Sequence, residues 1–138
     1  MTDWKAFTVE TKDHVAQVTL IGPNKGNAMG PDFWRELPEI FTELDADPEV
    51  RAVVLAGSGK NFSYGLDLAA MGGEFAPLLA DKALAAPRTT FHDTVKRMQA
   101  SITAVADCRK PVIAAISGHA VAGGLELALW ADLRVVDD

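Results

Sequence analysis

The chain has 138 residues, of which 49% are hydrophobic and 23% are charged, so it is long enough for one core and too short for two. Its formal net charge of −6 argues against nucleic acid or an anionic membrane as the main partner. The lone cysteine, Cys108, excludes an internal disulfide framework, and its place at the end of an apolar helix pattern favours packing over reactivity. The first ten residues lack the apolar core of a signal peptide, and no run approaches a membrane span. We therefore expect one cytoplasmic domain, residues 1–138.

The first part of the chain predicts a β-hairpin followed by a helix. Residues 6–11 and 14–21 are rich in β-branched side chains and are separated by a short polar break, which is typical of paired strands. Residues 22–30 form a loop dense in Gly, Pro and Asn. A helix is predicted from near Pro31, and Pro38 is expected to interrupt and kink it. The apolar residues of this helix recur at helical spacing: Phe33, Leu37, Ile40, Phe41 and Leu44.

The middle of the chain alternates between strand, loop and helix patterns. Residues 51–59 predict a short buried strand that ends in a glycine turn, and residues 60–73 predict a loop with one helical turn. Residues 75–87 have a helical composition that Pro87 breaks, so their path is left open. Residues 90–106 form the strongest predicted helix. Its apolar stripe predicts core packing without a functional role: Phe91, Val95, Met98, Ile102 and Val105.

The last part of the chain repeats the strand-and-helix order. Residues 110–116 predict a buried strand, residues 117–122 a turn, and Gly123 the start of a helix. Residues 132–138 open a final strand. The repeating order of strands and helices indicates an α/β fold in a single domain.

Several motif-like stretches do not meet the requirements of the sites they imitate. Residues 57–60, "GSGK", lack the first glycine of a phosphate-binding loop, and residues 61–65, "NFSYG", lack the first glycine of a nucleophile elbow. The three histidines, His14, His92 and His119, have no metal-ligand spacing with a cysteine or an acid. No metal site is predicted.

The stretch "AAISGHAVAGGLELALW", residues 114–130, places two glycines and an acid in an apolar segment. A helix start leaves backbone N–H groups unpaired and partly positive, and Gly123 and Gly124 lack a Cβ, so an oxygen atom of a ligand can approach those groups. Glu126 follows by almost one helical turn on the same face as Gly123. A partly buried carboxylate there is suited to proton transfer beside a bound carbonyl.

A second backbone donor is predicted in "FSYGLDL", where Gly65 permits a tight turn and the Leu66 N–H can point into the same cavity. The alternative is that both glycine sites are ordinary turns between a strand and a helix. Residue types alone do not decide between these two interpretations.

The segments "GKNFSYGLDLAAM" and "KPVIAAISGHAVAGGLELALWADLRVV" together resemble the crotonase superfamily, the enoyl-CoA hydratase/isomerase family. The opening "VAQVTLIGPNKGNAMG" resembles the first strand pair and coenzyme A loop of that family, so the resemblance spans essentially the whole chain. It implies a crotonase-like spiral of repeated ββα units. The family continues well beyond the position of Asp138, so the spiral is expected to be truncated at its C-terminus.

The resemblance also implies roles for individual residues. It makes Leu66 and Gly123 the two backbone donors to a thioester oxygen, and it makes Glu126 one of the two acids of a hydratase. For Asp67 we favour a role in bracing the loop. The implied coenzyme A site consists of Lys25, Asn27, Ala28, Tyr64, Gly65, Leu66, Asp67 and Leu68.

The implied activity is that of an enoyl-CoA hydratase, which adds water to a 2-enoyl-CoA in fatty acid metabolism. The alternatives are an enoyl- or dienoyl-CoA isomerase and a non-catalytic acyl-CoA-binding fragment that lacks the second acid. No cofactor is expected, because coenzyme A is part of the substrate. The full chain is expected to form a homo-oligomer, a trimer or a dimer of trimers. Ala122 replaces the first glycine of the family's three-glycine run, which is tolerable if its backbone is ordinary.

Overall fold

The computed structural model describes residues 3–22, 25–78, 80 and 85–137. Residues 23–24 of the predicted first loop, and residues 79 and 81–84 of the segment 75–87 that Pro87 breaks, lie outside this description. The elements in chain order are β1 (Phe7–Lys12), β2 (Val15–Leu20), η1 (Lys25–Asn27), α1 (Pro31–Ala46), β3 (Ala52–Gly57), α2 (Leu68–Phe75), α3 (Ala85–Asp107), β4 (Val112–Ile116), α4 (Gly123–Trp130) and β5 (Leu133–Val136).

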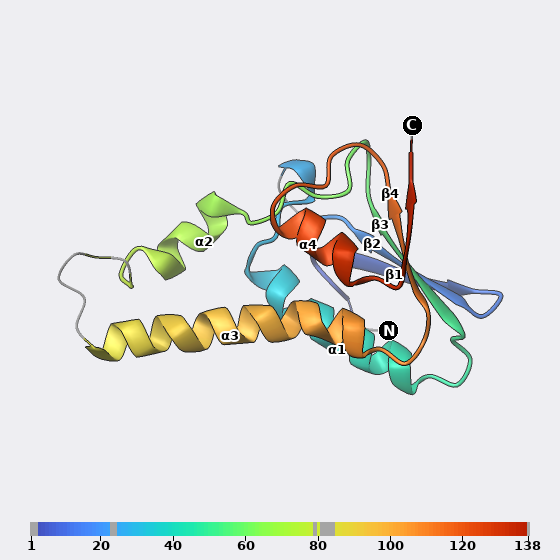
Figure 1. Ribbon diagram of the computed structural model, residues 1–138, viewed down its shortest axis with the longest axis horizontal. Coiled ribbons are helices and arrows are strands. Elements are labelled where there is room, and N and C mark those ends of the chain that lie inside the picture. The colour runs from blue at the N-terminus through green and yellow to red at the C-terminus, as the bar shows by residue number, and fades with distance from the viewer. Residues whose placement is uncertain (1–2, 23–24, 79, 81–84, 138) are drawn as a thin grey trace.

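One five-stranded sheet organises the chain, in the order β1-β2-β3-β4-β5 (Figure 1). β1 and β2 pair antiparallel, which confirms the predicted hairpin, and β2 to β5 are parallel to their neighbours. Each connection after the hairpin carries a helix and advances the chain by one strand. The predicted α/β class is confirmed.

The core lies between one face of the sheet and the helices. Alternate residues of β2 are buried, because successive side chains of a strand point to opposite faces. β3 and β4 show the same alternation. These side chains share one hydrophobic cluster with buried residues of α1, α3 and α4. The interleaved residues Val54, Ile113 and Ala115 are half-buried, so the described residues cover the opposite face only in part.

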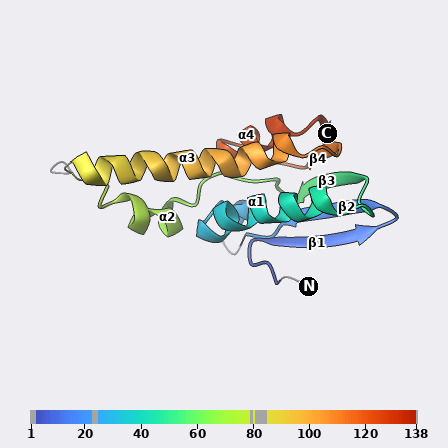
Figure 2. The same ribbon diagram turned by 90° about the horizontal axis from the view of Figure 1, so that it is seen from below.

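Helix α1 runs as one element from Pro31 to Ala46, so the interruption predicted at Pro38 is wrong. A proline inside a helix removes the hydrogen bond to the carbonyl four residues earlier, here that of Trp34. That carbonyl accepts a hydrogen bond from α3 instead. α1 and α3 lie side by side (Figure 2), and this contact satisfies the group that the proline leaves unpaired.

Helix α3 begins at Ala85, before Pro87, and therefore starts earlier than predicted. A proline is tolerated in the first turn of a helix because the N–H groups there have no partner inside the helix. Cys108 follows the helix and packs against the core. Burial raises the pKa of its thiol, so little of the reactive thiolate is present at neutral pH.

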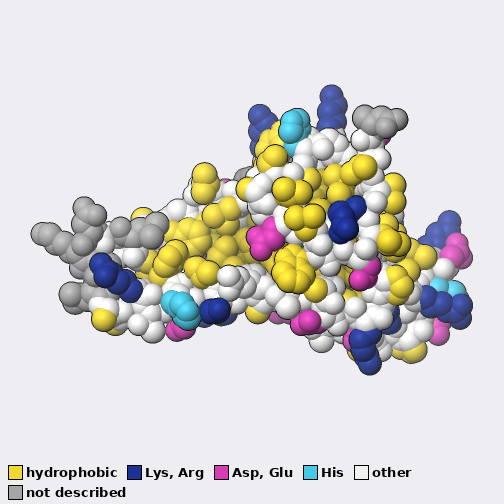
Figure 3. All heavy atoms as spheres, viewed as in Figure 1, with side chains coloured by type: hydrophobic (Ala, Val, Ile, Leu, Met, Phe, Trp, Pro, Cys, Tyr) yellow, Lys and Arg dark blue, Asp and Glu magenta, His cyan; other side chains and the backbone are white. Residues whose placement is uncertain are grey.

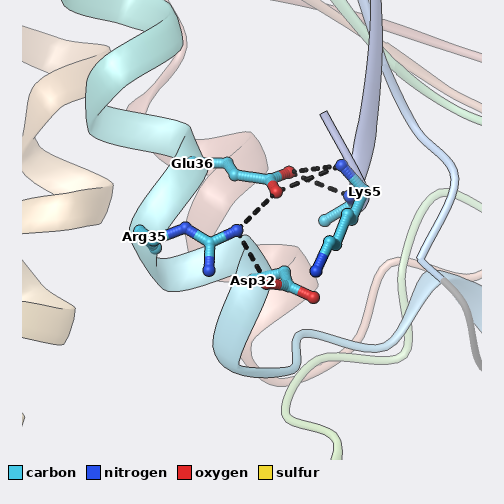
Figure 4. Close-up of polar contacts among 5 residues, drawn as sticks. Lys5, Asp32, Arg35 and Glu36 are labelled. Atoms are coloured by element: carbon cyan, nitrogen blue, oxygen red, sulfur yellow. Dashed lines mark hydrogen bonds and ion pairs between the residues drawn. The ribbon is translucent and has the colours of Figure 1, made fainter. Parts of the chain in front are cut away.

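A buried carboxylate on α1 anchors the chain just before β1 (Figure 4). The Glu36 side chain accepts hydrogen bonds from the backbone N–H groups of Lys5, at 3.1 Å, and Ala6, at 2.9 Å. Arg35 donates to Glu36 at 2.9 Å and also pairs with Asp32 at 2.7 Å. Glu36 is only 1% exposed. A buried charge is tolerated when it is paired and hydrogen-bonded in this way.

Exposed hydrophobic side chains gather on α4 and β5 and between α2 and α3 (Figure 3). All four residues of β5 are exposed, and β5 is an edge strand of the described sheet. The larger exposed side chains on these two elements are Leu125, Leu129, Trp130, Leu133, Val135 and Val136. Among the described helices, none has the length and apolar character needed to cross a membrane.

Candidate active site

Three loops stack at the carboxyl ends of β2, β3 and β4 (Figure 1). Two isolated parallel bridges join them, one between Met29 and Leu66 and the other between Ser63 and Ala120. Each unit therefore contains a strand of the sheet, a short extended segment that touches the next unit, and a helix. In open α/β sheets, ligands bind outside the carboxyl ends of parallel strands, which is the edge where these loops meet.

Asn27 fastens the first loop to the second. Its Nδ2 group donates to the carbonyl oxygens of Ser58 and Asn61, both at 2.9 Å, and of Phe62, at 3.1 Å. Its Oδ1 accepts from the Ser58 hydroxyl at 2.9 Å, and its own carbonyl accepts from the Ser63 hydroxyl at 2.9 Å. Asn27 is buried, so its side chain holds the two loops together and is turned away from solvent.

The second and third loops touch at Gly65 and Gly123. Gly65 has a φ of +85°, and a Cβ atom on it would lie 2.8 Å from the Gly123 nitrogen and 3.0 Å from the Val121 oxygen. A Cβ atom on Gly123 would lie 3.9 Å from the Leu66 nitrogen. The Leu66 and Gly123 amides thus lie at one contact between two loops. Within the described part of the chain, neither amide donates a hydrogen bond.

Gly124 has a different role from the one predicted for it. Its N–H donates to the Val121 oxygen at 2.9 Å, so that group is used inside the turn. A Cβ atom on Gly124 would lie 2.4 Å from the Ser63 oxygen, closer than packed atoms come. The prediction that the Gly124 N–H faces a ligand is wrong: this glycine lets α4 pack against the second loop, and the Gly123 N–H is left as the donor.

Ala122, the N-cap residue of α4, has φ +50° and ψ −121°. The condition for tolerating the replacement of glycine, an ordinary backbone, is not met, because residues with a Cβ rarely adopt this conformation and glycine adopts it freely. The bridge between Ser63 and Ala120 fixes the chain just before this residue. The ψ angle of Ala122 sets the plane of the peptide that carries the Gly123 N–H, so the strained residue directs that donor.

Glu126 is exposed, so the partial burial expected for its carboxylate is not observed. It lies on the wall of a cavity of about 270 Å³ between α2, α3 and α4. Most of the wall is apolar, with Trp34, Phe75, Phe91, Val95, Met98 and Ile102 as its main side chains. Ile102 and Val105 of the α3 stripe lie in the core, as predicted, but four residues of the stripe also line this cavity. Their spacing could not reveal this, because a helix face that packs and one that lines a cavity have the same period.

The remaining predicted site residues divide into exposed and buried positions. Asp67 is buried and caps α2, accepting a hydrogen bond from the Ala70 N–H at 2.9 Å. Lys25 and Leu68 are exposed, and Ala28 is half-buried. Tyr64 is 38% exposed, and its ring stands edge-on to that of His119, with centroids 5.8 Å apart. The described residues contain no group of three acids, histidines or cysteines placed to hold a metal ion.

The sequence pattern of the enoyl-CoA hydratase/isomerase family matches residues 10–138. The chain belongs to this family. This enoyl-CoA hydratase/isomerase chain is similar to the mitochondrial Delta(3,5)-Delta(2,4)-dienoyl-CoA isomerase of Mus musculus, at 41% identity over 88% of this chain and 37% of that protein. It is also similar to the (E)-benzylidenesuccinyl-CoA hydratase of Thauera aromatica, at 37% identity over 93% of this chain and 45% of that protein.

The fold of this family member also matches solved structures. The enoyl-CoA hydratase from Mycobacterium smegmatis superposes with a TM-score of 0.84 and 30% identity, covering 99% of this chain and 49% of that one. The predicted membership of the crotonase superfamily and its α/β fold are confirmed. The chain spans less than half the length of each of these three proteins.

Proposed function

We propose that the chain binds an acyl-CoA thioester with its carbonyl oxygen between the Leu66 and Gly123 amides, and that the whole protein is an enoyl-CoA hydratase. The observation that supports this most is the contact between the two loops. It brings together two backbone amides that donate to none of the described residues. One of them, that of Gly123, is at the start of α4, and Glu126 of the same helix lies on the wall of an apolar cavity.

The two amides would act as an oxyanion hole. Addition to an α,β-unsaturated thioester, or proton transfer beside its carbonyl, moves negative charge onto the carbonyl oxygen. Two fixed N–H groups stabilise that charge without reorganising, and removal of one such donor costs about 3 kcal/mol in comparable sites. Gly123 is the first residue of α4, so the partial positive charge of the helix start adds to its effect.

Glu126 would supply the proton-transfer group. It lies three residues after Gly123 in α4 and faces the cavity, which would hold the acyl group. In a hydratase, its carboxylate would orient or deprotonate the attacking water. The coenzyme A part would leave the cavity along the loop surface, where Lys25, Tyr64 and Leu68 are exposed.

Isomerisation of a double bond is the second candidate. The Mus musculus relative at 41% identity is named as a dienoyl-CoA isomerase. Among the described residues that line the cavity, Glu126 is the one carboxylic acid. One carboxylate can remove a proton from one carbon atom and return it to another, so isomerisation needs no second acid in principle.

Binding and turnover by the 138-residue chain are measured separately. Calorimetry with butyryl-CoA is expected to show binding that Gly65→Ala abolishes, because the new Cβ would push apart the loops that carry the two amides. Crotonyl-CoA hydration and 3,5-dienoyl-CoA isomerisation are then compared. Glu126→Gln is expected to lower kcat by about 10²- to 10⁴-fold without weakening butyryl-CoA binding.

Glu39→Gln, an exposed acid on α1, is the matched control and is expected to change neither quantity. Isomerisation without hydration would select the second candidate. Binding that survives Glu126→Gln, with no turnover of either substrate, would select a non-catalytic acyl-CoA-binding protein. No affinity for any thioester would overturn the proposal.

A further inference from the structure

Strand β1 is an edge of the five-stranded sheet and lies beside α1 (Figure 2). A groove of about 640 Å³, called here the β1 groove, is lined by residues 3, 4, 7–11, 43 and 47. Because successive side chains of a strand point to opposite faces, a groove that touches five consecutive residues of β1 follows the free edge of that strand. Among the described residues, none lines both this groove and the cavity that Glu126 faces.

The backbone of β1 presents hydrogen-bonding groups on this free edge. The Ile21 N–H donates to the Ala6 oxygen at 2.9 Å, just before the first residue pair of the antiparallel ladder. Hydrogen-bonded pairs alternate along such a ladder with pairs that make no hydrogen bond to each other. The register therefore turns the backbone groups of Phe7, Val9 and Thr11 away from β2. Within the described part of the chain, these groups have no backbone partner in a loop or helix.

Strand β1 lacks two features that commonly stop an edge strand from pairing with another chain. It contains no proline, and its register with β2 continues through all six residues without a bulge. Its one lysine, Lys12, is its last residue. Trp4 and Phe7 add apolar surface to the lining of the groove. The β1 groove can therefore accept an extended segment that pairs with β1 as a further strand.

The lining of the β1 groove is acidic. Its described residues include four acids and no base: Asp3, Glu10, Glu43 and Asp47. None of these acids forms an ion pair with a described residue. Lys110 donates to the backbone oxygen of Asp47 but does not line the groove. The partial negative charge at the C-terminal end of α1 adds to the acids, and the last turn of that helix contains no basic residue. The field in the groove favours a positively charged occupant.

We propose that the β1 groove binds an extended segment of a partner protein, rich in lysine or arginine, by strand addition to β1. The segment would exchange main-chain hydrogen bonds with the free edge of β1, which supply affinity without regard to sequence. Charge in the groove would then select basic side chains. This inference is independent of the proposed function.

The positions of the acids agree with this mode of binding. Phe7 packs on Phe33 of α1, with ring centroids 5.3 Å apart, so the inner face of β1 is the face that α1 covers. Every second side chain of an added strand would point toward that face, where Glu43 and Asp47 line the groove. A second copy of β1 is a poorer occupant, because it would bring the same acids together across the new strand pair.

A synthetic peptide tests the proposal. The probe is a fluorescent, capped peptide of alternating lysine and valine, about ten residues long, which matches a long strand. Fluorescence anisotropy at low salt is expected to show that it binds to the 138-residue chain, and that added salt weakens binding. A glutamate-valine peptide is expected not to bind. A lysine-valine peptide methylated on every backbone nitrogen keeps its charge but cannot donate to β1, and it is expected to bind much more weakly.

Substitutions locate the site. Glu43→Lys is expected to weaken binding of the lysine-valine peptide about two- to tenfold, because it replaces an attraction with a repulsion. Glu39→Lys, at an exposed position of α1 outside the groove, is the matched control and is expected to change affinity by less than about twofold.

A second pair of variants tests the backbone contact. Thr11→Pro removes an N–H group from the free edge of β1 but leaves the ladder with β2, and it is expected to weaken binding about two- to tenfold. Thr11→Val keeps that N–H group and is expected to bind as the unmodified chain does. Circular dichroism establishes that each variant folds. If Thr11→Pro does not fold, the methylated peptide tests the same hydrogen bonds.

Absence of binding by the lysine-valine peptide would overturn the proposal. Equal affinity for the methylated peptide would exclude strand addition, and equal effects of Glu43→Lys and Glu39→Lys would exclude the β1 groove as the site. Spermine that binds as tightly as the peptide would assign the groove to a small polycation instead. Sedimentation that shows a dimer of the chain, dissociated by Thr11→Pro, would make a second copy the occupant and would likewise overturn the proposal.

Discussion

The hydroxyl of Ser101 on α3 donates a 2.7 Å hydrogen bond to the backbone oxygen of Trp34 on α1. Pro38, four residues after Trp34, has no N–H to give that oxygen its helical partner. Ser101 is buried, and its hydroxyl also lies 3.0 Å from the Arg97 oxygen in its own helix. One side chain on α3 thus compensates for a proline on α1.

Ser101→Ala is expected to lower the free energy of unfolding by about 1 to 3 kcal/mol, because it leaves the Trp34 oxygen without a partner. Urea denaturation measures this change. Thr103→Ala is the control, since half-buried Thr103 also donates to the carbonyl four residues earlier in α3, but through a hydrogen bond that is exposed to solvent. Equal effects of the two substitutions would show that the bond between the helices has no special role.

Ala122→Gly is expected to stabilise the fold by about 1 kcal/mol. Glycine relieves a backbone strain of roughly 1 to 3 kcal/mol, and its greater freedom in the unfolded chain offsets part of that gain. Thermal unfolding measures the change. The control, Ala100→Gly in the exposed interior of α3, is expected to destabilise the fold by about 0.5 to 1 kcal/mol. A lower melting temperature for Ala122→Gly would contradict the strain inferred at this residue.

Glu36→Ala is expected to destabilise the fold by about 3 kcal/mol, because it leaves the Lys5 and Ala6 N–H groups and the Arg35 guanidinium without their shared acceptor. Amide hydrogen exchange of β1 is expected to accelerate more than that of β4, since the contact holds the start of β1. Glu43→Ala, at an exposed position on the same helix, is the control. Uniform acceleration across the sheet would argue against a local anchor.

The ion pair between Asp45 and Arg109 predicts a pH dependence. The Arg109 side chain donates to Asp45 at 2.9 Å, and its backbone N–H donates at 2.7 Å, which holds the pKa of the Asp45 carboxyl below its ordinary value. Because the pKa of Asp45 is lowered in the folded state, the ion pair makes its full contribution to the free energy of unfolding at neutral pH. That contribution is lost as the carboxyl is protonated. The stability difference between the unmodified chain and Asp45→Asn is therefore expected to shrink below about pH 4. A difference that grows with acidity would reverse the assigned sign.

Local patterns in the sequence predict the elements well. β-branched runs separated by a short polar break predict the hairpin of β1 and β2, and apolar residues at helical spacing predict the buried face of α1. Gly65 and Gly123 indicate where the loops approach one another. Each lies in a turn whose close approach leaves little room for a Cβ atom, and a glycine in a turn can be recognised in the sequence.

Features that depend on how the loops and helices meet could not be predicted in this way. The conformation of Ala122 follows from the bridge between Ser63 and Ala120, two residues far apart in the sequence. The cavity exists because Phe75 on α2 stands opposite the α3 stripe, with the rings of Phe75 and Phe91 edge-to-face at 5.7 Å. The exposure of Glu126 likewise depends on which face of α4 meets the sheet.

The bridges between the stacked loops also determine when the site can form during synthesis. Residues 29 and 66, and residues 63 and 120, meet only after long stretches of intervening chain have been closed. Such distant pairings form slowly, after the local hairpin and helices. The contact between the Leu66 and Gly123 amides therefore cannot form until α4 has left the ribosome, and any ligand that binds there will stabilise the finished fold over its late intermediates.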